Sequence, residues 1–455
     1  MKANNFDTIC APATVRGESA IAVIRISGPE AFKICSKILK NQQIPDKFEH
    51  RKATLAYITK NSYEIIDKVV ITPYKAPNSF TGEDLVEIST HGSPIIIDKT
   101  IELLIENGAR YAKEGEFTKR AFIHGKMNLI EAESIIDVIE SKTDKILSYA
   151  TKNLMGNLNE KLQNYNSFLL NIYSQLNLAI DFDEEHIDDT KWNEINENLK
   201  EIINKIQKDI RKSKKMMKEK RGVVVLLLGP TNVGKSTLMN TILDEKRAIV
   251  SEIAGTTRDY IKEELVIQGH HVRLYDTAGL RKNAEELEKL GIKKTKELID
   301  MADIAIYLKE ITQTVENKKI YNHLKDNKSI EFIEVVNKID LSDKDTFIDK
   351  KDKIFISAKD KINIDKLMKV LVKKIENLTA MKKADAIVLN QRQLDYLIRL
   401  KSKIQEAIST IQKTPYEEIV SEQIREAIEI LEIIRGKKVT EEMLNNIFNR
   451  FCIGK

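Results

Sequence analysis

The spacing of apolar residues predicts different structures in successive parts of the chain. Over residues 1–119, short β-rich runs such as 20–26 and 84–89 alternate with helical patterns such as 95–107. Apolar residues at every second position predict strands, whereas apolar residues three and four apart predict helices. We therefore expect the first segment to form an α+β domain.

The rest of the chain is expected to form a helical domain with an α/β domain inserted into it. Apolar residues recur at helical spacing over 120–218 and again over 379–455, whereas strand and helix patterns alternate over 219–378. The second helical segment is too short to have much core of its own, so packing against the first would bury the apolar faces of both. The predicted fold class is a multidomain protein with an α+β N-terminal domain, an all-α domain formed by two chain segments, and an inserted α/β domain.

A phosphate-binding loop is predicted at residues 229–236, which read Gly-Pro-Thr-Asn-Val-Gly-Lys-Ser. These residues follow an apolar run and precede a helical pattern, which is the order strand, glycine-rich turn, helix. Backbone N–H groups of such a loop point at phosphates, with the helix dipole behind them. We expect Lys235 to reach the β- and γ-phosphates and Ser236 to bind Mg²⁺. A chance glycine-rich turn is the alternative, and the motifs downstream count against it.

Three further motifs, each directly after an apolar run, indicate which nucleotide binds. The first begins with an Asp that would lie beside the Mg²⁺. The second ends with an Asp that can accept hydrogen bonds from N1–H and the 2-amino group of guanine, groups that adenine does not supply. The third is the usual partner loop for the guanine carbonyl oxygen, so together they predict that GTP binds to a Ras-like P-loop GTPase domain. The motifs are Asp276-Thr277-Ala278-Gly279, Asn337-Lys338-Ile339-Asp340 and Ser357-Ala358-Lys359.

Residues 251–259 are expected to form switch I, with the Thr257 hydroxyl closing on Mg²⁺. The backbone carbonyls of Ser251, Ile253 and Thr256, with the side-chain carbonyl of Asn232, form an oxygen set that could hold a monovalent cation. Such an ion would stabilise charge on the leaving oxygens, as an arginine finger does elsewhere. The residues predicted to contact the nucleotide are Asn232, Val233, Gly234, Lys235, Ser236, Thr237, Ser251, Glu252, Ile253, Ala254, Gly255, Thr256, Thr257, Asp276, Thr277, Ala278, Gly279, Asn337, Lys338, Asp340, Ser357, Ala358 and Lys359.

The position that holds a water-orienting glutamine in Ras-like switches is Leu280 in this chain. A leucine side chain cannot orient water, so hydrolysis needs another group. The acidic candidates are Glu285, Glu286 and Glu288. By residue identity alone, each of them is most simply a solvated charge on a helix.

The GTPase motifs resemble those of the potassium-dependent, dimerisation-activated GTPases of the TrmE–Era group. The whole chain resembles one family of that group, the MnmE (TrmE) family of tRNA-modification GTPases. The C-terminal sequence Phe-Cys-Ile-Gly-Lys is the most specific part of this resemblance, because chain ends normally vary freely. The residues that carry the resemblance lie at 24–28, 77–84, 91–92, 115–122, 229–236, 253–259, 276–281 and 451–455.

The resemblance implies roles for individual residues. Glu288 would be the catalytic glutamate, Ser236 and Thr257 would bind Mg²⁺, and K⁺ would bind at Asn232 and the carbonyls of Ser251, Ile253 and Thr256. A reduced folate, 5-formyl- or 5,10-methylene-tetrahydrofolate, would bind at Arg25, Glu87, Lys126 and Lys455. Residues 13–18 depart from the glycine- and proline-rich turn of the family, so this loop of the folate domain is expected to differ in shape.

The resemblance also implies a function and partners. The chain would form a homodimer through its N-terminal domain, and K⁺-dependent dimerisation of the GTPase domains would activate hydrolysis. With the flavin-dependent partner MnmG, in a heterotetramer, it would add a carboxymethylaminomethyl- or aminomethyl-type group at C5 of the wobble uridine of certain tRNAs. The one-carbon unit would come from the bound folate.

Composition permits an anionic partner without requiring one. The 455 residues carry a net charge of +5, and the lysine surplus concentrates at 211–215 and 218–221. Such a run is usually a solvated helix face, and contact with an RNA backbone is the alternative. The three cysteines form no C-x-x-C pair, and no apolar run approaches the ~18 residues of a membrane span. Residues 1–7 lack a basic region followed by an apolar stretch, so we expect no signal peptide. We therefore expect a cytoplasmic protein with no membrane segment.

Two functions from other classes compete with tRNA modification. One is a ribosome-assembly GTPase of the Era/Der type, but such proteins normally carry an RNA-binding appendage in place of the domain that contains Arg25 and Glu87. The other is a folate-dependent one-carbon transferase in which the GTPase domain is a secondary regulator.

Overall fold

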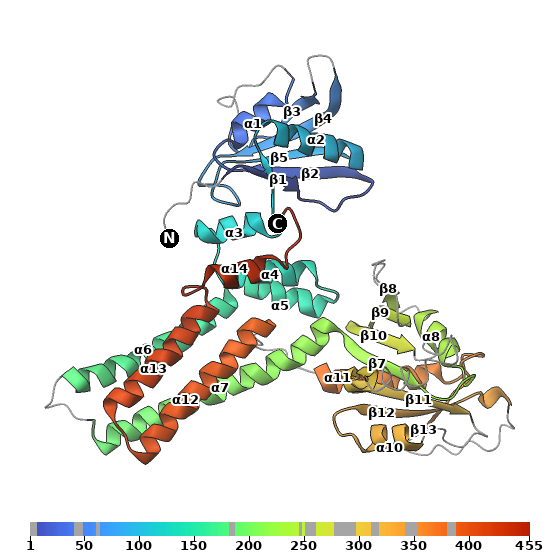
Figure 1. Ribbon diagram of the computed structural model, residues 1–455. Helices are drawn as coiled ribbons and strands as arrows, with labels where there is room; N and C mark the ends of the chain where they lie inside the picture. Colours follow the sequence, from blue (N-terminus) through green and yellow to red (C-terminus); the bar gives the residue numbers. More distant parts are fainter. Residues whose placement is uncertain are drawn as a thin grey trace, which may run out of the picture. The chain divides into compact units, whose positions relative to one another are not determined.

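The computed structural model describes residues 7–40, 49–60, 64–181, 187–244, 248–250, 261–276, 297–310, 318–341, 353–379 and 388–455 (Figure 1). The chain divides into two compact units. The first comprises Met1–Ile136, Asn153–Leu178 and Ser421–Lys455, and the second comprises Asp137–Lys152 and Ala179–Val420.

The N-terminal part of the first unit is built on a six-stranded sheet of order β3-β4-β5-β2-β1-β6. Its neighbouring strands are antiparallel, except that β6 runs parallel to β1. Helices α1 (Ala31–Lys37) and α2 (Pro94–Glu106) pack on the sheet in one hydrophobic core, which includes Ile34, Ile88 and Leu104. This arrangement confirms the α+β prediction. The strands are β1 (Ile9–Pro12), β2 (Ser19–Ser27), β3 (Thr54–Thr59), β4 (Ile65–Tyr74), β5 (Leu85–Gly92) and β6 (Arg110–Tyr111).

The C-terminal tail of the chain packs against this N-terminal part. The Phe117 N–H donates to the carbonyl oxygen of Lys455 at 3.2 Å. Gly454 has a φ of +91°, and a Cβ on it would lie 1.9 Å from the carbonyl oxygen of Pro12. Phe451 is buried beside Phe448. The glycine is therefore needed for the tail to approach β1 this closely.

Each unit contains helices from both of the chain segments predicted to be helical. Helices α4, α6, α13 and α14 lie mainly in the first unit, and α5, α7 and α12 lie mainly in the second. The longest, α7 (Asp189–Arg221), begins where the Asp188 side chain accepts a hydrogen bond from Lys191 N at 2.7 Å. Helix α12 (Gln391–Lys413) lies along α7 (Figure 1) and begins with a capping box. The remaining helices are α3 (Glu116–Ile123), α4 (Leu129–Ile139), α5 (Asp144–Leu154), α6 (Asn157–Asp181), α13 (Glu417–Ile434) and α14 (Glu441–Phe448).

The inserted domain is a seven-stranded sheet of order β13-β12-β11-β7-β10-β9-β8. Its central strands are parallel, and only β9 runs antiparallel to its neighbours. Every residue of β7 is buried, as expected for a strand covered on both faces. The strands are β7 (Val223–Leu228), β8 (Ala248–Val250), β9 (Ile261–Ile267), β10 (His270–Asp276), β11 (Ile304–Glu310), β12 (Glu331–Asn337) and β13 (Lys353–Phe355).

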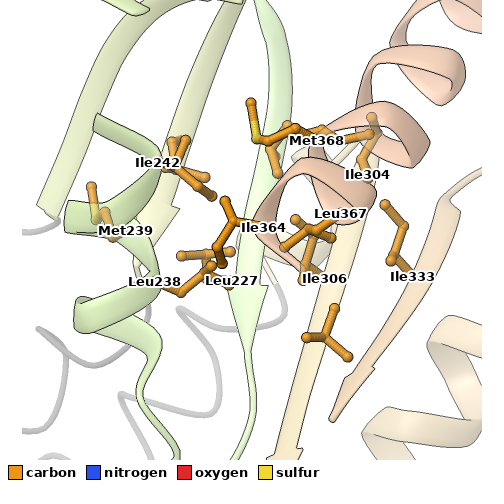
Figure 2. Close-up of a cluster of buried hydrophobic side chains, with 14 of the residues drawn as sticks. Leu227, Leu238, Met239, Ile242, Ile304, Ile306, Ile333, Ile364, Leu367 and Met368 are labelled. Atoms are coloured by element: carbon orange, nitrogen blue, oxygen red, sulfur yellow. The ribbon is translucent and has the colours of Figure 1, made fainter. Parts of the chain in front are cut away.

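Helices α8 (Lys235–Asp244) and α11 (Ile364–Thr379) share one hydrophobic core of this domain. Figure 2 shows Leu238 of α8 and Leu367 of α11 among the strand residues Leu227 and Ile306. A second core is formed by the strand residues that alternate with those of the first. It includes Tyr307 of β11 and Leu324 of α10 (Lys318–Asp326). The α/β prediction is confirmed, and the sheet carries the predicted glycine-rich loop at the end of its central strand.

The end of α7 is connected to the inserted domain by buried polar contacts. The fully buried Glu219 carboxylate accepts hydrogen bonds from His270 Nδ1 at 3.0 Å and from the His271 N–H at 3.2 Å. Burial by itself raises the pKa of Glu219, but these hydrogen bonds together with the charges of His270 and Lys145 outweigh it, and the net pKa is lowered. Two residues on, Arg221 Nη2 donates to both carboxylate oxygens of Asp303, each at 2.8 Å.

In the part of the chain that the structure describes, no helix is long and apolar enough to cross a membrane.

Candidate functional site

The loop between β7 and α8 has a backbone path that only glycine permits at two positions. Gly229 has a φ of +143°, and a Cβ there would lie 2.2 Å from the carbonyl oxygen of Leu308. Gly234 has a φ of +93°, and its Cβ would lie 2.3 Å from Asn337 Nδ2. Asn232 also has a positive φ, 59°, and is exposed. Both glycines of the predicted motif are therefore explained by steric limits inside the domain.

Lys235 lies inside the curve of this loop. Its side chain is buried, with a residue exposure of 6%, and Nζ donates to the carbonyl oxygens of Gly229 at 3.0 Å and Pro230 at 2.5 Å. A buried ammonium needs such partners, because an unpaired charge away from water is costly. The loop thus holds the cation where a P-loop lysine meets the β- and γ-phosphates.

Ser236 and Asp276 form a pair of hard oxygen groups beside the loop. Ser236 Oγ donates to Asp276 Oδ2 at 2.8 Å, across a separation of 40 residues in the sequence. Asp276 ends β10 and is 1% exposed, whereas Ser236 is exposed at the start of α8. Among the described residues, no group of three or more His, Cys, Asp or Glu is placed to hold a metal. This donor set fits Mg²⁺, which binds few protein ligands and takes its other oxygens from phosphates and water.

Asn337 links the phosphate loop to the predicted guanine loops. It ends β12, is 2% exposed, and donates from Nδ2 to the Val233 carbonyl oxygen at 2.8 Å. Its Oδ1 accepts from the Ala358 N–H at 2.9 Å. Thr241 Oγ1 of α8 donates to the Ala358 carbonyl oxygen at 3.0 Å. Three motifs far apart in the sequence are therefore hydrogen-bonded into one site.

The residues predicted to recognise guanine lie on the same edge of the sheet. Asp340 is exposed on a short 3-10 helix, Ile339–Leu341, directly after β12. Ser357 is fully buried and Lys359 is exposed, in the loop after β13. This edge, where the carboxyl ends of parallel strands meet, is where ligands bind to open α/β sheets.

Glu310 is a member of this edge that the motif analysis missed. It is the last residue of β11 and forms an ion pair with Lys338, whose φ is +67°. Both side chains are partly buried. The available signal was positional, because Glu310 ends a parallel strand as Asp276 and Asn337 do.

Many of the predicted GTPase residues lie outside the described residues. These are the switch I residues and the residues after Asp276, so the cation site and the catalytic glutamate stay predictions. They comprise Ser251, Glu252, Ile253, Ala254, Gly255, Thr256, Thr257, Thr277, Ala278, Gly279, Leu280, Glu285, Glu286 and Glu288.

Arg25 and Glu87, both predicted to bind folate, face each other on neighbouring strands. They are paired in the register of β2 and β5, and Arg25 Nε donates to Glu87 Oε1 at 2.8 Å. The Arg25 guanidinium lies 5.2 Å from the centre of the Phe80 ring. Tyr74 donates to Glu87 Oε2 at 3.4 Å, and burial together with this carboxylate raises the pKa of Tyr74.

The other two predicted folate residues belong to the same compact unit. Lys126 Nζ donates to the carbonyl oxygen of Pro77 at 2.8 Å, so it contacts the segment that also carries Phe80. Lys455 is half-buried in the tail that packs on β1. An arginine over an aromatic ring, a carboxylate and two lysines can pair with the donors, acceptors and carboxylates of a pterin with a glutamate tail. The residues present therefore fit a folate.

Arg120 supports this region. It lies in the 115–122 motif that carries the family resemblance, but no role was predicted for it from the sequence. It is 1% exposed and donates to Glu83 Oε2 at 3.2 Å and to Glu116 Oε1 at 3.0 Å. Ser27 Oγ donates to Glu83 Oε2 at 2.8 Å and lies 2.7 Å from Thr81 Oγ1. No periodic pattern marks such a residue, because its partners come from distant parts of the sequence.

A phosphate loop on the central parallel strand β7, with guanine-type motifs after β12 and β13 of the same sheet, defines a P-loop GTP-binding protein. Two family models match this chain: "GTP-binding protein TrmE N-terminus" over residues 8–126 and "MnmE helical domain" over residues 129–452. The chain belongs to the MnmE family of tRNA modification GTPases, which confirms the predicted resemblance.

Curated relatives match over nearly their whole length. The protein of Fervidobacterium nodosum named tRNA modification GTPase MnmE is 39% identical over 99% of this chain and 98% of its own. The proteins of the same name from Thermotoga maritima and Thermoanaerobacter pseudethanolicus are 35% and 36% identical, each over 99% of this chain and 100% of theirs. Among solved structures, Aquifex aeolicus Era bound to GDP·AlF4⁻ matches with 24% identity over 40% of this chain and 66% of its own. The TM-score of this match is 0.26.

Proposed function

We propose that this chain hydrolyses GTP in the modification of the wobble uridine of certain tRNAs. The observation that carries the proposal is the single site formed by Lys235, Ser236, Asp276, Asn337 and Asp340 at one sheet edge, in a chain that matches the family over its length. The relatives are named for tRNA modification, which supports tRNA as the substrate class.

Within this site the described residues have separate tasks. Lys235 and the loop N–H groups neutralise the β- and γ-phosphates, and Asp340 selects guanine through its two acceptor oxygens. Ser236 and Asp276 are the groups that would hold Mg²⁺, which supplies charge neutralisation at the phosphates when bound. Asn337 keeps the phosphate loop and the 357–359 loop in register.

The potassium site and the catalytic glutamate are part of the proposal. Asn232, with the carbonyls of Ser251, Ile253 and Thr256, would hold K⁺, and Glu288 would orient the attacking water in place of Leu280. Support comes from the sequence motifs and from the exposed position of Asn232 on the phosphate loop. GTP turnover should be fast in K⁺ and poor in Na⁺, and equal rates in the two salts would remove the cation from the proposal. Glu288→Ala should keep nucleotide affinity and lose turnover. Near-normal turnover in this variant would mean that Glu288 is only a solvated charge and has no catalytic role.

The N-terminal domain is proposed to bind a tetrahydrofolate through Arg25, Glu87, Lys126 and Lys455. The proposed domains are residues 1–119, 120–218 with 379–455, and 219–378. We further propose a homodimer through the first of them, K⁺-dependent approach of the GTPase domains, and assembly with the flavin-dependent MnmG in the cytoplasm. The one-carbon unit of the folate would become part of the group added at C5 of the uridine.

Chromatography of nucleosides from the tRNA of a deletion strain tests the function. We expect the modified wobble uridines to disappear and to return with a plasmid copy of the gene. Unchanged wobble uridines together with accumulated ribosome precursors would favour a ribosome-assembly GTPase of the Era/Der type. A folate-dependent one-carbon transferase with a secondary GTPase would instead leave tRNA modification intact in a Lys235→Ala strain.

A further inference from the structure

The last third of α7 exposes a dense group of cations. Residues 208–218 contain a single acidic residue, Asp209, which is 2% exposed and so does not face solvent. We define the α7 basic face as the cations of this stretch that lie on its outer side. Its members are Lys208, Arg211, Lys212, Lys214 and Lys215.

Three members of this face have no acidic partner. Lys208, Arg211 and Lys214 are exposed, and no carboxylate of the described residues lies within ion-pair distance of them. Two lysines directly before this stretch of the same helix are paired: Lys200 Nζ lies 2.7 Å from Glu197, and Lys205 Nζ lies 2.7 Å from Glu201. Three cations without a carboxylate partner among the described residues thus lie close together, within residues 208–214.

Helix stability does not account for these cations. Like charges three residues apart, as in Lys208 with Arg211 and Arg211 with Lys214, disfavour a helix. The helix dipole favours cations only in the last turn, which here is occupied by Lys218, Lys220 and Arg221. The face therefore carries a concentration of charge that the fold itself does not require.

The surroundings of the face select the kind of partner. The opposite side of the helix is buried, with Ile206, Ile210 and Ser213 at most 8% exposed, and α12 packs along the helix. A membrane-surface helix must insert its apolar side, and in α7 that side is already covered. The exposed positions between 204 and 215 are all Asn, Lys or Arg, whereas protein interfaces need apolar or aromatic anchors. A polyanion recognised by charge alone fits both observations.

We propose that the α7 basic face contacts the phosphate backbone of the tRNA on which this chain acts. The inference rests on the proposed function for the choice of tRNA as the polyanion. Lys208 and Lys214 are about 9 Å apart along the helix axis, from a rise of about 1.5 Å per residue, so the three free cations can meet successive phosphates of one strand. Each contact releases a condensed counterion, so this part of the binding must weaken steeply as salt is added.

The test is a full-length triple variant, Lys208→Gln with Arg211→Gln and Lys214→Gln. Glutamine has a helix propensity similar to that of lysine and arginine, so α7 should remain folded. The matched control is Lys33→Gln with Lys200→Gln and Lys403→Gln, which removes the same charge from cations paired with a glutamate three residues away. Binding of total tRNA from the deletion strain is measured over a series of KCl concentrations.

We expect the triple variant to bind tRNA about tenfold or more weakly at low salt and to lower the salt slope by about three, one for each phosphate contact. The control should keep the wild-type slope, and both variants should keep wild-type GTP turnover without tRNA. A triple variant with wild-type affinity and slope would overturn the proposal, as would a wild-type protein that binds no tRNA. Loss of binding to phosphatidylserine vesicles, with tRNA binding kept, would also overturn it and assign the face to a membrane surface.

The nucleoside chromatography separates failure of this inference from failure of the function. If the wild-type gene restores the modified uridines while the triple variant binds tRNA normally, the function stands and the basic face is not the contact. If deletion leaves the uridines unchanged, the function fails, and the binding series still decides whether the face binds RNA.

Discussion

Removal of the Asn337 side chain should loosen two loops of the nucleotide site at once. In Asn337→Ala, the Val233 carbonyl and the Ala358 N–H lose their hydrogen-bond partner. In the wild-type protein these two hydrogen bonds are 2.8 and 2.9 Å long, and Asn337 is only 2% exposed. A buried group left unpaired costs about 1–3 kcal/mol. Local opening at Ala358 should therefore become about 5- to 150-fold more populated, from the relation between free energy and equilibrium constant.

Hydrogen exchange of the nucleotide-free protein measures this opening directly, because the Ala358 amide is one of the two groups concerned. We expect its exchange to accelerate by about 5- to 150-fold. The affinity for GDP should fall by about tenfold, since the phosphate loop loses its hydrogen bond from Asn337 to the Val233 carbonyl. Asn327→Ala is the matched control, because Asn327 Oδ1 accepts only within a surface turn, from Ser329 N at 3.0 Å. Unchanged exchange at Ala358 in the variant would refute the role given to the Asn337 amide.

Three other predictions follow from single side chains. Asp340→Asn should weaken GTP binding by about 100-fold or more and favour xanthosine triphosphate, because two hydrogen bonds to a charged acceptor are lost; competition with a fluorescent nucleotide measures this. Burial raises the pKa of Cys10 and of Cys35 to about 12, so at pH 8 only the exposed Cys452 should react rapidly with a thiol reagent. In urea, all three cysteines should react. The pKa of Glu219 is lowered from 4.5, so the ionised carboxylate stabilises the folded state above pH 4.5, and this stabilisation is lost as the pH falls below that value. Glu219→Gln should therefore lower the free energy of unfolding in urea by about 1–3 kcal/mol at pH 7, and by progressively less below pH 4.5.

Each of these has an outcome that would contradict it. An Asp340→Asn protein with unchanged preference for GTP would remove that carboxylate from base recognition. Two or more fast thiols in the native protein would mean that the buried cysteines are accessible. A stability difference for Glu219→Gln that stays constant between pH 7 and pH 3.5 would show that the charge of this carboxylate is not what stabilises the α7 junction.

The sequence alone determined the parts of this protein whose chemistry is local. The phosphate loop could be predicted because a strand, a tight turn and a helix start are adjacent in the chain, and because the glycine positions answer a steric demand within that turn. The order of the three motifs after apolar strands was enough to predict guanine. The arrangement of helical segments around an inserted α/β domain followed from the period of the apolar residues.

The tertiary structure decided everything that depends on which distant residues meet. The sequence could list Asn337 as a nucleotide residue, but only folding places its amide between Val233 and Ala358, and only folding pairs Lys338 with Glu310 and buries Arg120 among three acidic residues. The basic run at 211–215 was ambiguous for the same reason. A run of charges does not say which side of a helix is covered. The burial of Asp209 and the packing of α12 on α7 leave Lys208, Arg211 and Lys214 exposed, with no carboxylate partner among the described residues.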